Sequence, residues 1–425
     1  MAHKVLAAHS GEKTVTPGQL VVTEVDLVVM ADSVFYKTAE RLPDDLLKVA
    51  HPERVAVLLD HAIPAPTVKA ATAHKRAREH SERLGFRYFS DIGRGGIEHQ
   101  IILEQRLALP GQLIACNDSH TSAAGVLNAA ARGLGMADIV QLVCTGRTWY
   151  KVSPTVLFRL EGRLPYGTYG KDVFLHIAQE YGSQEGHDVE FAGDGLGSLS
   201  LDDRATLSTM CTELNANFVM MPADQLILDY VSTVTDRVYT PVYSDPDAEY
   251  DAVHTVDLSA VRPSVALPDA MNKNVKSAAQ VGDEKVRIDQ AFVGSCANGK
   301  LSDLKIAADI VRGRKIAGHV RFLVTPASQS VYLEAVKAGY VETLTEAGAM
   351  VTSSTCGACS GGHMGVLGPG ETCITSSTRN YRGRMGSADA KIYMGSSATV
   401  AASALTGYVT DPMPYLEALD LEVAR

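Results

Sequence analysis

The sequence of 425 residues contains no apolar run long enough to cross a membrane, since a membrane helix needs about 18 or more such residues. Its first residues also lack the apolar segment of a secretory signal peptide. Positive charge is scarce: 39 lysines and arginines are outweighed by 49 acidic residues, which leaves a net charge of −10. Nucleic-acid binding requires a basic surface. We therefore expect a cytoplasmic protein that binds neither a membrane nor nucleic acid.

Cysteine is also rare, with seven residues in the whole chain. In the cytoplasm cysteines stay reduced unless they bind a metal or take part in chemistry. Four of them lie in apolar or alanine-rich segments, and we expect them to pack in the core: Cys116, Cys144, Cys211 and Cys373. The other three lie in segments that contain glycine and are the candidates for chemistry: Cys296, Cys356 and Cys359.

The sequence does contain a regular succession of short apolar runs, polar or glycine turns, and helical segments. The strands that it predicts lie at 54–59, 112–115, 287–294, 319–325, 349–353 and 373–377. The predicted helices lie at 73–84, 122–134, 303–311, 329–338 and 341–347. Such alternation is typical of βαβ units and mostly parallel sheets. We expect an α/β protein with three domains: 1–152, 153–278 and 279–425.

Thiol side chains follow two of the predicted strands. Cys296 follows the strand at 287–294, and Cys356 and Cys359 follow the strand at 349–353. Because the carboxyl ends of parallel strands open on one edge of a sheet, residues far apart in sequence can meet there. Thiolates are preferred ligands of soft metals and iron–sulfur clusters, and three of them would leave one iron of a four-iron cluster open to substrate. Core packing, a zinc site and a redox pair are the alternatives.

Two arginines, Arg379 and Arg384, follow the predicted strand at 373–377. A guanidinium group binds a carboxylate through two parallel hydrogen bonds. Two such groups beside a metal-binding loop suit a di- or tricarboxylic acid. A solvated basic loop is the alternative interpretation.

Carboxylates and histidines occur close together at Asp60-His61, at His99 and at Asp118-Ser119-His120. A histidine oriented by a carboxylate can protonate a leaving hydroxyl group. Taken singly, each of these sites is also typical of a turn or a helix cap. Glu190 lies within another predicted strand, where an isolated glutamate usually faces solvent.

Together these motifs resemble the aconitase family, in particular the large subunits of its 3-isopropylmalate dehydratases and homoaconitases of the archaeal two-subunit type. The motifs occur in the family's order over nearly the whole chain. They are Leu59-Asp60-His61, Gly96-Ile97-Glu98-His99-Gln100, Asp118-Ser119-His120-Thr121, Thr145-Gly146-Arg147-Thr148-Trp149, Gly294-Ser295-Cys296-Ala297-Asn298-Gly299, Cys356-Gly357-Ala358-Cys359 and Arg379-Asn380-Tyr381-Arg382-Gly383-Arg384.

The resemblance implies three α/β domains with mostly parallel sheets around a central cluster site. The implied [4Fe–4S] cluster has three ligands, Cys296, Cys356 and Cys359, and its open iron binds the substrate's hydroxyl group and one carboxylate. The residues implied to hold the substrate are Arg379, Arg384 and Ser119. The implied catalytic residues are His61, which protonates the leaving hydroxyl group, its partner Asp60, and, in hydrogen bonds around the iron-bound oxygens, His99, Asp118, His120 and Glu190.

The function that the resemblance implies is a hydro-lyase acting on a small hydroxy di- or tricarboxylic acid, first of all one of the 3-isopropylmalate type. Homoaconitate, dimethylmalate, citraconate and maleate remain alternative substrates. A cluster-free binding or regulatory protein and a zinc–thiolate protein remain alternative classes.

The sequence departs from the family pattern at several positions. Thr378 stands where the family usually has asparagine, Glu98 where many members have cysteine, and Met30-Ala31-Asp32-Ser33 lacks the usual glutamine or glutamate. The Gly-Ser-Ser-Arg turn that supplies the family's serine base is also missing, since Gly395-Ser396-Ser397-Ala398 lacks the arginine and is predicted to start a helix. We therefore expect the base on a separate small subunit that carries the swivelling domain.

Overall fold

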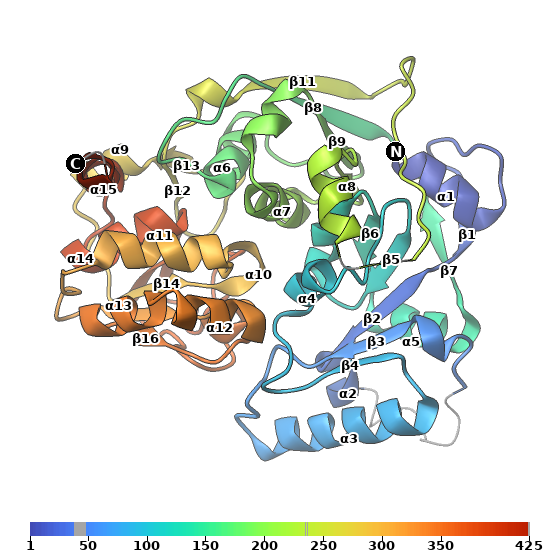
Figure 1. The fold of residues 1–425 in the computed structure, drawn as a ribbon, viewed down its shortest axis with the longest axis horizontal. Coiled ribbons are helices and arrows are strands. Elements are labelled where there is room, and N and C mark those ends of the chain that lie inside the picture. Colours follow the sequence, from blue (N-terminus) through green and yellow to red (C-terminus); the bar gives the residue numbers. More distant parts are fainter. Residues whose placement is uncertain (38–47, 234, 236, 424–425) are drawn as a thin grey trace. The chain divides into compact units, whose positions relative to one another are not determined.

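The computed structural model describes residues 1–37, 48–233, 235 and 237–423. The chain, drawn in Figure 1, forms two compact units. The first unit comprises residues 1–161, 184–196 and 214–256, and the second unit comprises residues 162–183, 197–213 and 257–425. The chain therefore passes between the units five times, and neither unit is one continuous stretch of sequence. The division into three domains near 152 and 278 stays a prediction.

A five-stranded parallel sheet forms the centre of the first unit. Its strands are, in order, β4 (Tyr88–Ser90), β3 (Val55–Leu58), β2 (Leu27–Ala31), β5 (Leu113–Cys116) and β6 (Ala130–Gly133). Strands β2, β3 and β5 are buried along their whole length, as parallel strands covered on both faces are. The strands predicted at 54–59 and 112–115 are confirmed as β3 and β5.

Helices α1 (Ala2–Ser10), α2 (Ser33–Lys37), α3 (Val68–Leu84), α4 (Glu98–Glu104), α5 (Met136–Thr145) and α8 (Gln225–Ser232) belong to the same unit. The predicted helix at 73–84 is confirmed as part of α3. The side chain of Thr67 caps the start of α3 by accepting a hydrogen bond from the N–H of Ala70. Gly85, with a φ of 68°, ends the helix in the left-handed conformation that glycine adopts without strain.

The helix predicted at 122–134 is wrong. Residues Ser119–Leu127 form a 3₁₀ segment, η3, and the chain then turns into strand β6. The turn is made by Asn128, whose φ is 63° and whose buried side chain bonds the backbone of Met221 and Val242. These contacts come from distant parts of the chain, so the local alanine content gave no sign of them.

Two smaller sheets complete the first unit. Strand β1 (Leu20–Glu24) pairs antiparallel with β7 (Arg147–Lys151). The other sheet has the order β10 (Val219–Met220), β9 (Asp188–Ala192), β8 (Thr155–Glu161) and β11 (Ala252–Asp257). Strand β9 runs parallel to both of its neighbours, and Glu190 lies at its middle, as predicted.

A seven-stranded sheet forms the centre of the second unit. Its order is β13 (Val275–Ser277), β12 (Ser264–Ala266), β18 (Lys391–Met394), β17 (Thr372–Thr375), β14 (Gln290–Val293), β15 (Arg321–Val324) and β16 (Met350–Val351). The five strands from β18 to β16 run parallel, whereas β12 is antiparallel to both of its neighbours. The four strands predicted in this third of the chain are thereby confirmed as β14, β15, β16 and β17.

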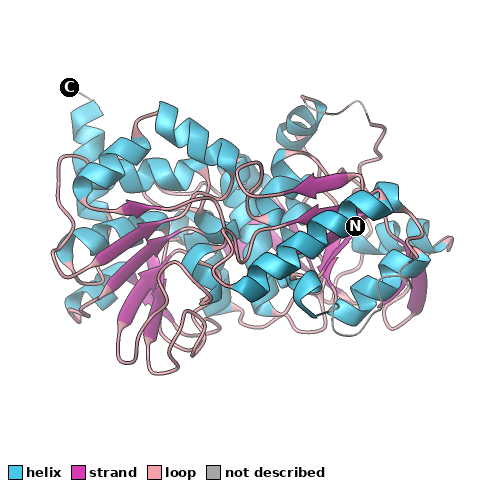
Figure 2. Cartoon of the chain, turned by 90° about the horizontal axis from the view of Figure 1, so that it is seen from below, coloured by secondary structure: helices cyan, strands magenta, loops and turns pink. Residues whose placement is uncertain are grey.

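The helices of the second unit are α6 (Gly170–Glu180), α7 (Leu201–Met210), α9 (Ala278–Asp283), α10 (Ser295–Asn298), α11 (Leu301–Val311), α12 (Gln329–Lys337), α13 (Tyr340–Ala347), α14 (Ser397–Thr406) and α15 (Met413–Val423). Figure 2 shows helices covering the strands. The predicted helices at 303–311, 329–338 and 341–347 are confirmed, as is a helix start at Ser396-Ser397. None of the helices in the described ranges is long and apolar enough to span a membrane.

Candidate active site

The carboxylates and histidines singled out in the first unit gather at one edge of the five-stranded sheet. Asp60 and His61 follow β3, while Asp118 and His120 follow β5. Strands β3 and β5 both pair with β2 in parallel, so their carboxyl ends open on the same side. His99 reaches this group from the first turn of α4.

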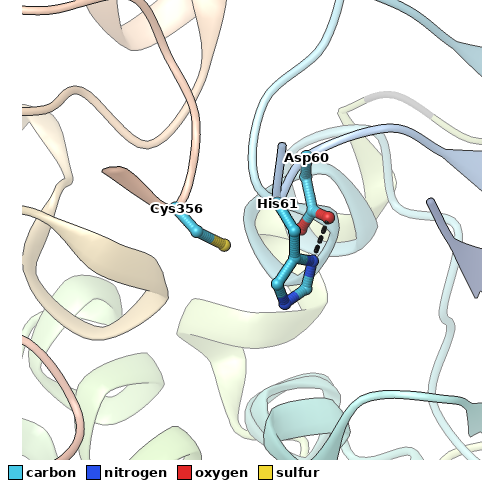
Figure 3. A group of neighbouring side chains, drawn as sticks. All are labelled: Asp60, His61 and Cys356. Atoms are coloured by element: carbon cyan, nitrogen blue, oxygen red, sulfur yellow. Dashed lines mark hydrogen bonds and ion pairs between the residues drawn. The ribbon is translucent and has the colours of Figure 1, made fainter. Parts of the chain in front are cut away.

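His61 is held by two carboxylates. Its Nδ1 lies 2.5 Å from Oδ1 of Asp60, the hydrogen bond drawn in Figure 3. Its Nε2 lies 3.5 Å from Oδ2 of Asp118. Asp60 is fully buried and also accepts a hydrogen bond from the backbone N–H of Glu98 at 3.0 Å. Both imidazole nitrogens thus lie near carboxylate oxygens.

Asp118 is the centre of the group. Its Oδ1 lies 2.8 Å from Nε2 of His99 and 3.3 Å from Nδ1 of His120, and it also accepts the backbone N–H of His120. Burial alone would raise the pKa of Asp118, but hydrogen bonds from His120, His61 and His99 hold that pKa well below its usual range. Asp118 is therefore an anion shared by three histidines.

Glu98 lies behind these carboxylates with its side chain fully buried. Burial, reinforced by the charges of Asp60 and Asp118, raises its pKa well above the usual range. The thiol of Cys116 donates to Oε2 of Glu98 at 3.3 Å. The pKa of this thiol is raised by burial and by Glu98. Both shifts favour the protonated forms, a carboxylic acid beside a thiol.

Ser119 directly follows a member of the acid–histidine group, whereas Glu190 bonds residues outside that group. Ser119 begins η3 directly after Asp118, whose side chain caps that segment. Glu190 is buried, so the expectation that an isolated strand glutamate faces solvent does not hold for it. Within the described ranges its carboxylate bonds Ser244 at 2.6 Å, Tyr250 at 3.1 Å and the amine of Met1, and none of the histidines. The structure does not bring Glu190 into the acid–histidine group.

The three candidate cysteines lie at the carboxyl edge of the seven-stranded sheet. Cys296 is in α10, directly after β14, and Cys356 and Cys359 lie in the turn after β16. Gly357 between them has a φ of 58°, and a Cβ atom there would lie 2.8 Å from Oγ1 of Thr325. Glycine is therefore needed for this turn. All seven cysteines lie within the described residues, and none of them forms a disulfide. Cys116, Cys211 and Cys373 are buried as predicted, whereas Cys144 is only half-buried.

Cys359 has hydrogen-bond donors around its sulfur. Nη2 of Arg384 and Oγ1 of Thr378 each lie 3.7 Å from Sγ. Burial alone would raise the pKa of Cys359, but the Arg384 guanidinium and the donors of Thr378 lower it to about 7. The neighbouring hydroxyl of Ser377 is buried without a hydrogen-bond partner among the described residues. A thiolate with spare donors beside it is the surrounding that a thiolate-ligated metal group requires.

Arg379 is fixed by a buried acid. Its Nε lies 2.7 Å from Oε1 of Glu213, and the hydroxyl of Tyr381 donates to Oε2 of the same carboxylate at 3.2 Å. Burial and the charge of Glu213 raise the pKa of Tyr381 to about 12. Arg379 and Arg384 are both partly buried, in contrast to Arg382. The solvated-loop alternative therefore fits Arg382 alone.

Similarity to known proteins identifies the family of this chain. The model of the aconitase family (aconitate hydratase) matches residues 3–407. The chain belongs to the aconitase family. It is an aconitase-family hydro-lyase, as the motifs predicted.

Curated aconitase-family relatives are similar over almost their entire lengths. The 3-isopropylmalate dehydratase large subunit of Mycolicibacterium smegmatis is 48% identical over 96% of this chain and 95% of its own. Large subunit 1 of the same enzyme from Methanopyrus kandleri is 40% identical over 98% and 99%. The crystal structure of the holo-form of Thermococcus kodakaraensis aconitase X, at 14% identity, matches 87% of this chain and 88% of its own with a TM-score of 0.50. This last likeness shows the fold alone and confirms the expected α/β class.

The departures from the aconitase-family pattern have structural counterparts. Thr378 still presents a hydroxyl to Cys359. Asp32, in the segment that lacks the usual glutamine or glutamate, is buried and lies 3.6 Å from Nδ1 of His61. It also accepts hydrogen bonds from the N–H of Ala62 and from His74. Burial alone would raise the pKa of Asp32, but the hydrogen bond from His74 and the charge of His61 outweigh burial and lower that pKa.

Asp32 and Glu213 of this aconitase-family chain were not among the site residues predicted from the sequence. Asp32 comes directly after β2, so the rule that strand ends carry site residues could have found it. Glu213 lies in a short 3₁₀ segment after α7 (Cys211–Leu214). No local pattern marks it, because its role depends on an arginine 166 residues away.

Proposed function

We propose that this chain is the cluster-bearing large subunit of a two-subunit hydro-lyase that acts on a small hydroxy di- or tricarboxylic acid of the 3-isopropylmalate type. The observation that carries the proposal is the contact between Arg384 and Cys359, a carboxylate-binding group 3.7 Å from a thiol with ligand character. The names of the relatives, 3-isopropylmalate dehydratase large subunits, support the substrate type and the need for a second chain.

Cys296, Cys356 and Cys359 would hold a [4Fe–4S] cluster. The donor set fits, since the three thiols lie at one sheet edge and Cys359 has the depressed pKa of a ready ligand. When bound, the cluster supplies a Lewis acid for the substrate's hydroxyl group and one carboxylate.

Arg379 and Arg384 bind the substrate's carboxylates in this proposal. A guanidinium group keeps its charge at any physiological pH and offers paired N–H donors. Glu213 fixes Arg379 through Nε, so its planar group is held in one orientation before substrate arrives. A group oriented in advance loses less conformational entropy when it binds.

His61 is the proton donor to the leaving hydroxyl group. Asp60 and Asp118 stabilise its charged form, since they lie near Nδ1 and Nε2 respectively. Of these two contacts, the one at Nε2 is the longer, at 3.5 Å, so the Nε2 proton is the one available for transfer. His99 and His120 keep Asp118 in place on its other oxygen.

Dehydration also needs a base that removes a proton from the neighbouring carbon, and such help is typically worth roughly 10²–10⁴-fold in rate. The three histidines of the acid–histidine group, His61, His99 and His120, all contact carboxylates, and none of them is assigned to that task. We propose that a small subunit with the swivelling domain supplies a serine base.

The test is anaerobic cluster reconstitution of this chain, alone and with a cognate small subunit, followed by assays with 3-isopropylmalate, homoaconitate, dimethylmalate, citraconate and maleate. We expect the brown colour of a cluster in the chain alone, little or no turnover, and turnover of one substrate class once the small subunit is added. Full turnover by the chain alone would contradict the two-subunit proposal. A colourless protein that binds zinc instead would contradict the cluster.

A further inference from the structure

Lys171 is a fully buried lysine in the first turn of α6. Its ammonium group donates a hydrogen bond to the backbone oxygen of Ser377 at 2.8 Å. Its other polar contacts are with the sulfur atoms of Met210 at 3.3 Å and Met394 at 4.0 Å. Among the residues that the structure describes, no carboxylate forms an ion pair with it. A buried cation without an anionic partner is rare in proteins, because desolvation of the charge is not offset.

Without a bound cluster, the surroundings of Lys171 do not offset the desolvation free energy of its buried charge. Burial lowers the pKa of Lys171 to about 7, against the opposing charges of Asp303, Cys296 and Cys359 and with a further decrease from Lys300. An apolar residue of the same length would fill the site at less cost to folding. The lysine therefore points to a function that needs positive charge at this position.

One peptide group connects Lys171 with the cysteine loops. The oxygen that accepts from Lys171 belongs to Ser377, and the N–H on the other side of the same peptide bond belongs to Thr378. The hydroxyl of the same Thr378 lies 3.7 Å from the sulfur of Cys359, and a backbone hydrogen bond from Thr378 is among the causes that lower the pKa of that thiol. Hydrogen bonds in such a chain polarise one another, so a positive charge at the oxygen strengthens the donor at the nitrogen.

A second buried lysine, Lys300, contacts the segment that carries Cys296. The Nζ of Lys300 donates to the backbone oxygen of Ala297 and to the hydroxyl of Thr206 at 3.0 Å. Its side chain is 3% exposed. Two buried ammonium groups thus support the backbone on which Cys296 and Cys359 are carried.

We infer that Lys171 is a positioning residue for the anionic thiolate-bound cluster: its buried charge, relayed by the Ser377–Thr378 peptide group, stabilises the cluster on Cys359. This inference rests on the proposed function in one respect, namely that the three cysteines bind a cluster. It adds a residue that does not touch the cluster and sets how firmly the cluster is held.

The test uses the full chain with Lys171→Met, which keeps length and removes charge, and Lys171→Gln, which keeps a donor for Ser377 without the charge. Cluster-free protein of both variants should melt at or above the wild-type temperature, because an unpaired buried charge has been removed. After anaerobic reconstitution both variants should lose iron to a chelator about 10- to 100-fold faster, the usual effect of removing a second-layer partner of a metal site. The reduction potential of the cluster should fall, because a nearby positive charge has been lost.

Lys337→Met is the matched control. Lys337 lies at the end of α12, its side chain is 60% exposed and it pairs with Glu334. This variant should keep wild-type iron loss and wild-type potential.

Wild-type rates of iron loss in both Lys171 variants would overturn the inference and leave the proposed function intact. Wild-type behaviour in Lys171→Gln alone would also overturn it, since the hydrogen bond and not the charge would then matter. Cluster-free variants that melt well below the wild type, with unchanged iron loss, would make Lys171 a structural residue. A wild-type chain that assembles no cluster would overturn both this inference and the proposed function.

Discussion

Single ionisable residues carry the chemistry that we propose for the first unit, and Asp60 is the clearest case. Asp60→Asn removes the charge that stabilises protonated His61 but keeps a side chain of the same shape. We expect kcat of the reconstituted two-chain enzyme to fall by roughly 10²–10⁴-fold, the usual contribution of a general acid, with cluster content unchanged. Asp91→Asn, at a surface pair with Arg78, is the control. If Asp60→Asn kept a kcat within twofold of wild type, the assignment of His61 as a general acid supported by Asp60 would be wrong.

The raised pKa of Glu98 makes the free energy of unfolding depend on pH. Its pKa in the folded protein is raised by burial and by Asp60 and Asp118, with opposing contributions from His61 and the Cys116 thiol. The folded state thus binds a proton that the unfolded state releases above about pH 4.3. The associated stability is fully present below that pH and is lost as pH rises toward the folded pKa.

Glu98→Gln, which mimics the protonated acid, should therefore melt at a higher temperature than wild type in mildly alkaline buffer and at the same temperature in acid. Thermal denaturation across this pH range provides the measurement. Parallel curves for the two proteins would mean that Glu98 is ionised when folded.

We expect Arg384 to recognise a substrate carboxylate through the planar shape of its guanidinium group as well as through its charge. Arg384→Lys keeps the charge but loses the planar pair of donors, and charge-assisted bonds of about 1.5–3 kcal/mol correspond to roughly a 10- to 100-fold lower kcat/KM. Arg382→Lys, at a side chain that is 68% exposed in the same turn, should leave kinetics unchanged. Equal kinetics in Arg384→Lys and wild type would restore the solvated-loop interpretation.

At the scale of elements, the ends of parallel strands explain why so much of the site could be predicted. The loops with Cys296, Cys356 and Arg379 follow β14, β16 and β17 as the sequence indicated, because apolar strand runs and the polar residues after them are local patterns. Glu213 and Lys171 could not be predicted, because each acquires its role from a partner that only the tertiary fold supplies. Glu190 likewise gave a mid-strand pattern but no sign of its burial against Ser244 and Tyr250.

The turn between η3 and β6 decides whether an alanine-rich segment forms a strand of the sheet. Asn128→Ala removes side-chain hydrogen bonds to Met221 and Val242 and places a non-glycine residue without a polar group in the left-handed region. At about 1 kcal/mol for each of the three lost bonds and about 1–2 kcal/mol for the backbone, we expect roughly 4–5 kcal/mol of destabilisation.

Asn128→Gly loses the same bonds and keeps the backbone freedom, so it should be less destabilised than Asn128→Ala by about 1–2 kcal/mol. Urea denaturation followed by circular dichroism measures both variants. Equal losses in the two would show that the conformation of the turn is not under strain.

At the scale of the whole molecule, the chemistry is divided between the units. The acid–histidine group belongs to the first unit. The three candidate ligand cysteines, the two arginines proposed to bind substrate and the two buried lysines belong to the second. Each cysteine is expected to be indispensable: replacing Cys296, Cys356 or Cys359 by serine should abolish cluster absorbance and activity together. A fully assembled cluster in any one of these variants would show that the cysteine replaced is not a ligand.

The interleaving of the two units has a consequence for biosynthesis. Every residue of the first unit precedes residue 257, whereas the second unit combines residues 162–183 and 197–213 with everything from 257 onward. Domains tend to fold as the ribosome delivers them, so the first unit can close while the cysteine loops are still untranslated. Lys171 and Glu213 then lack their partners Ser377 and Arg379 until the last strands have been translated. Loading of the proposed cluster on Cys296, Cys356 and Cys359 would therefore come at the end of translation, after the unit with the acid–histidine group has been synthesised in full.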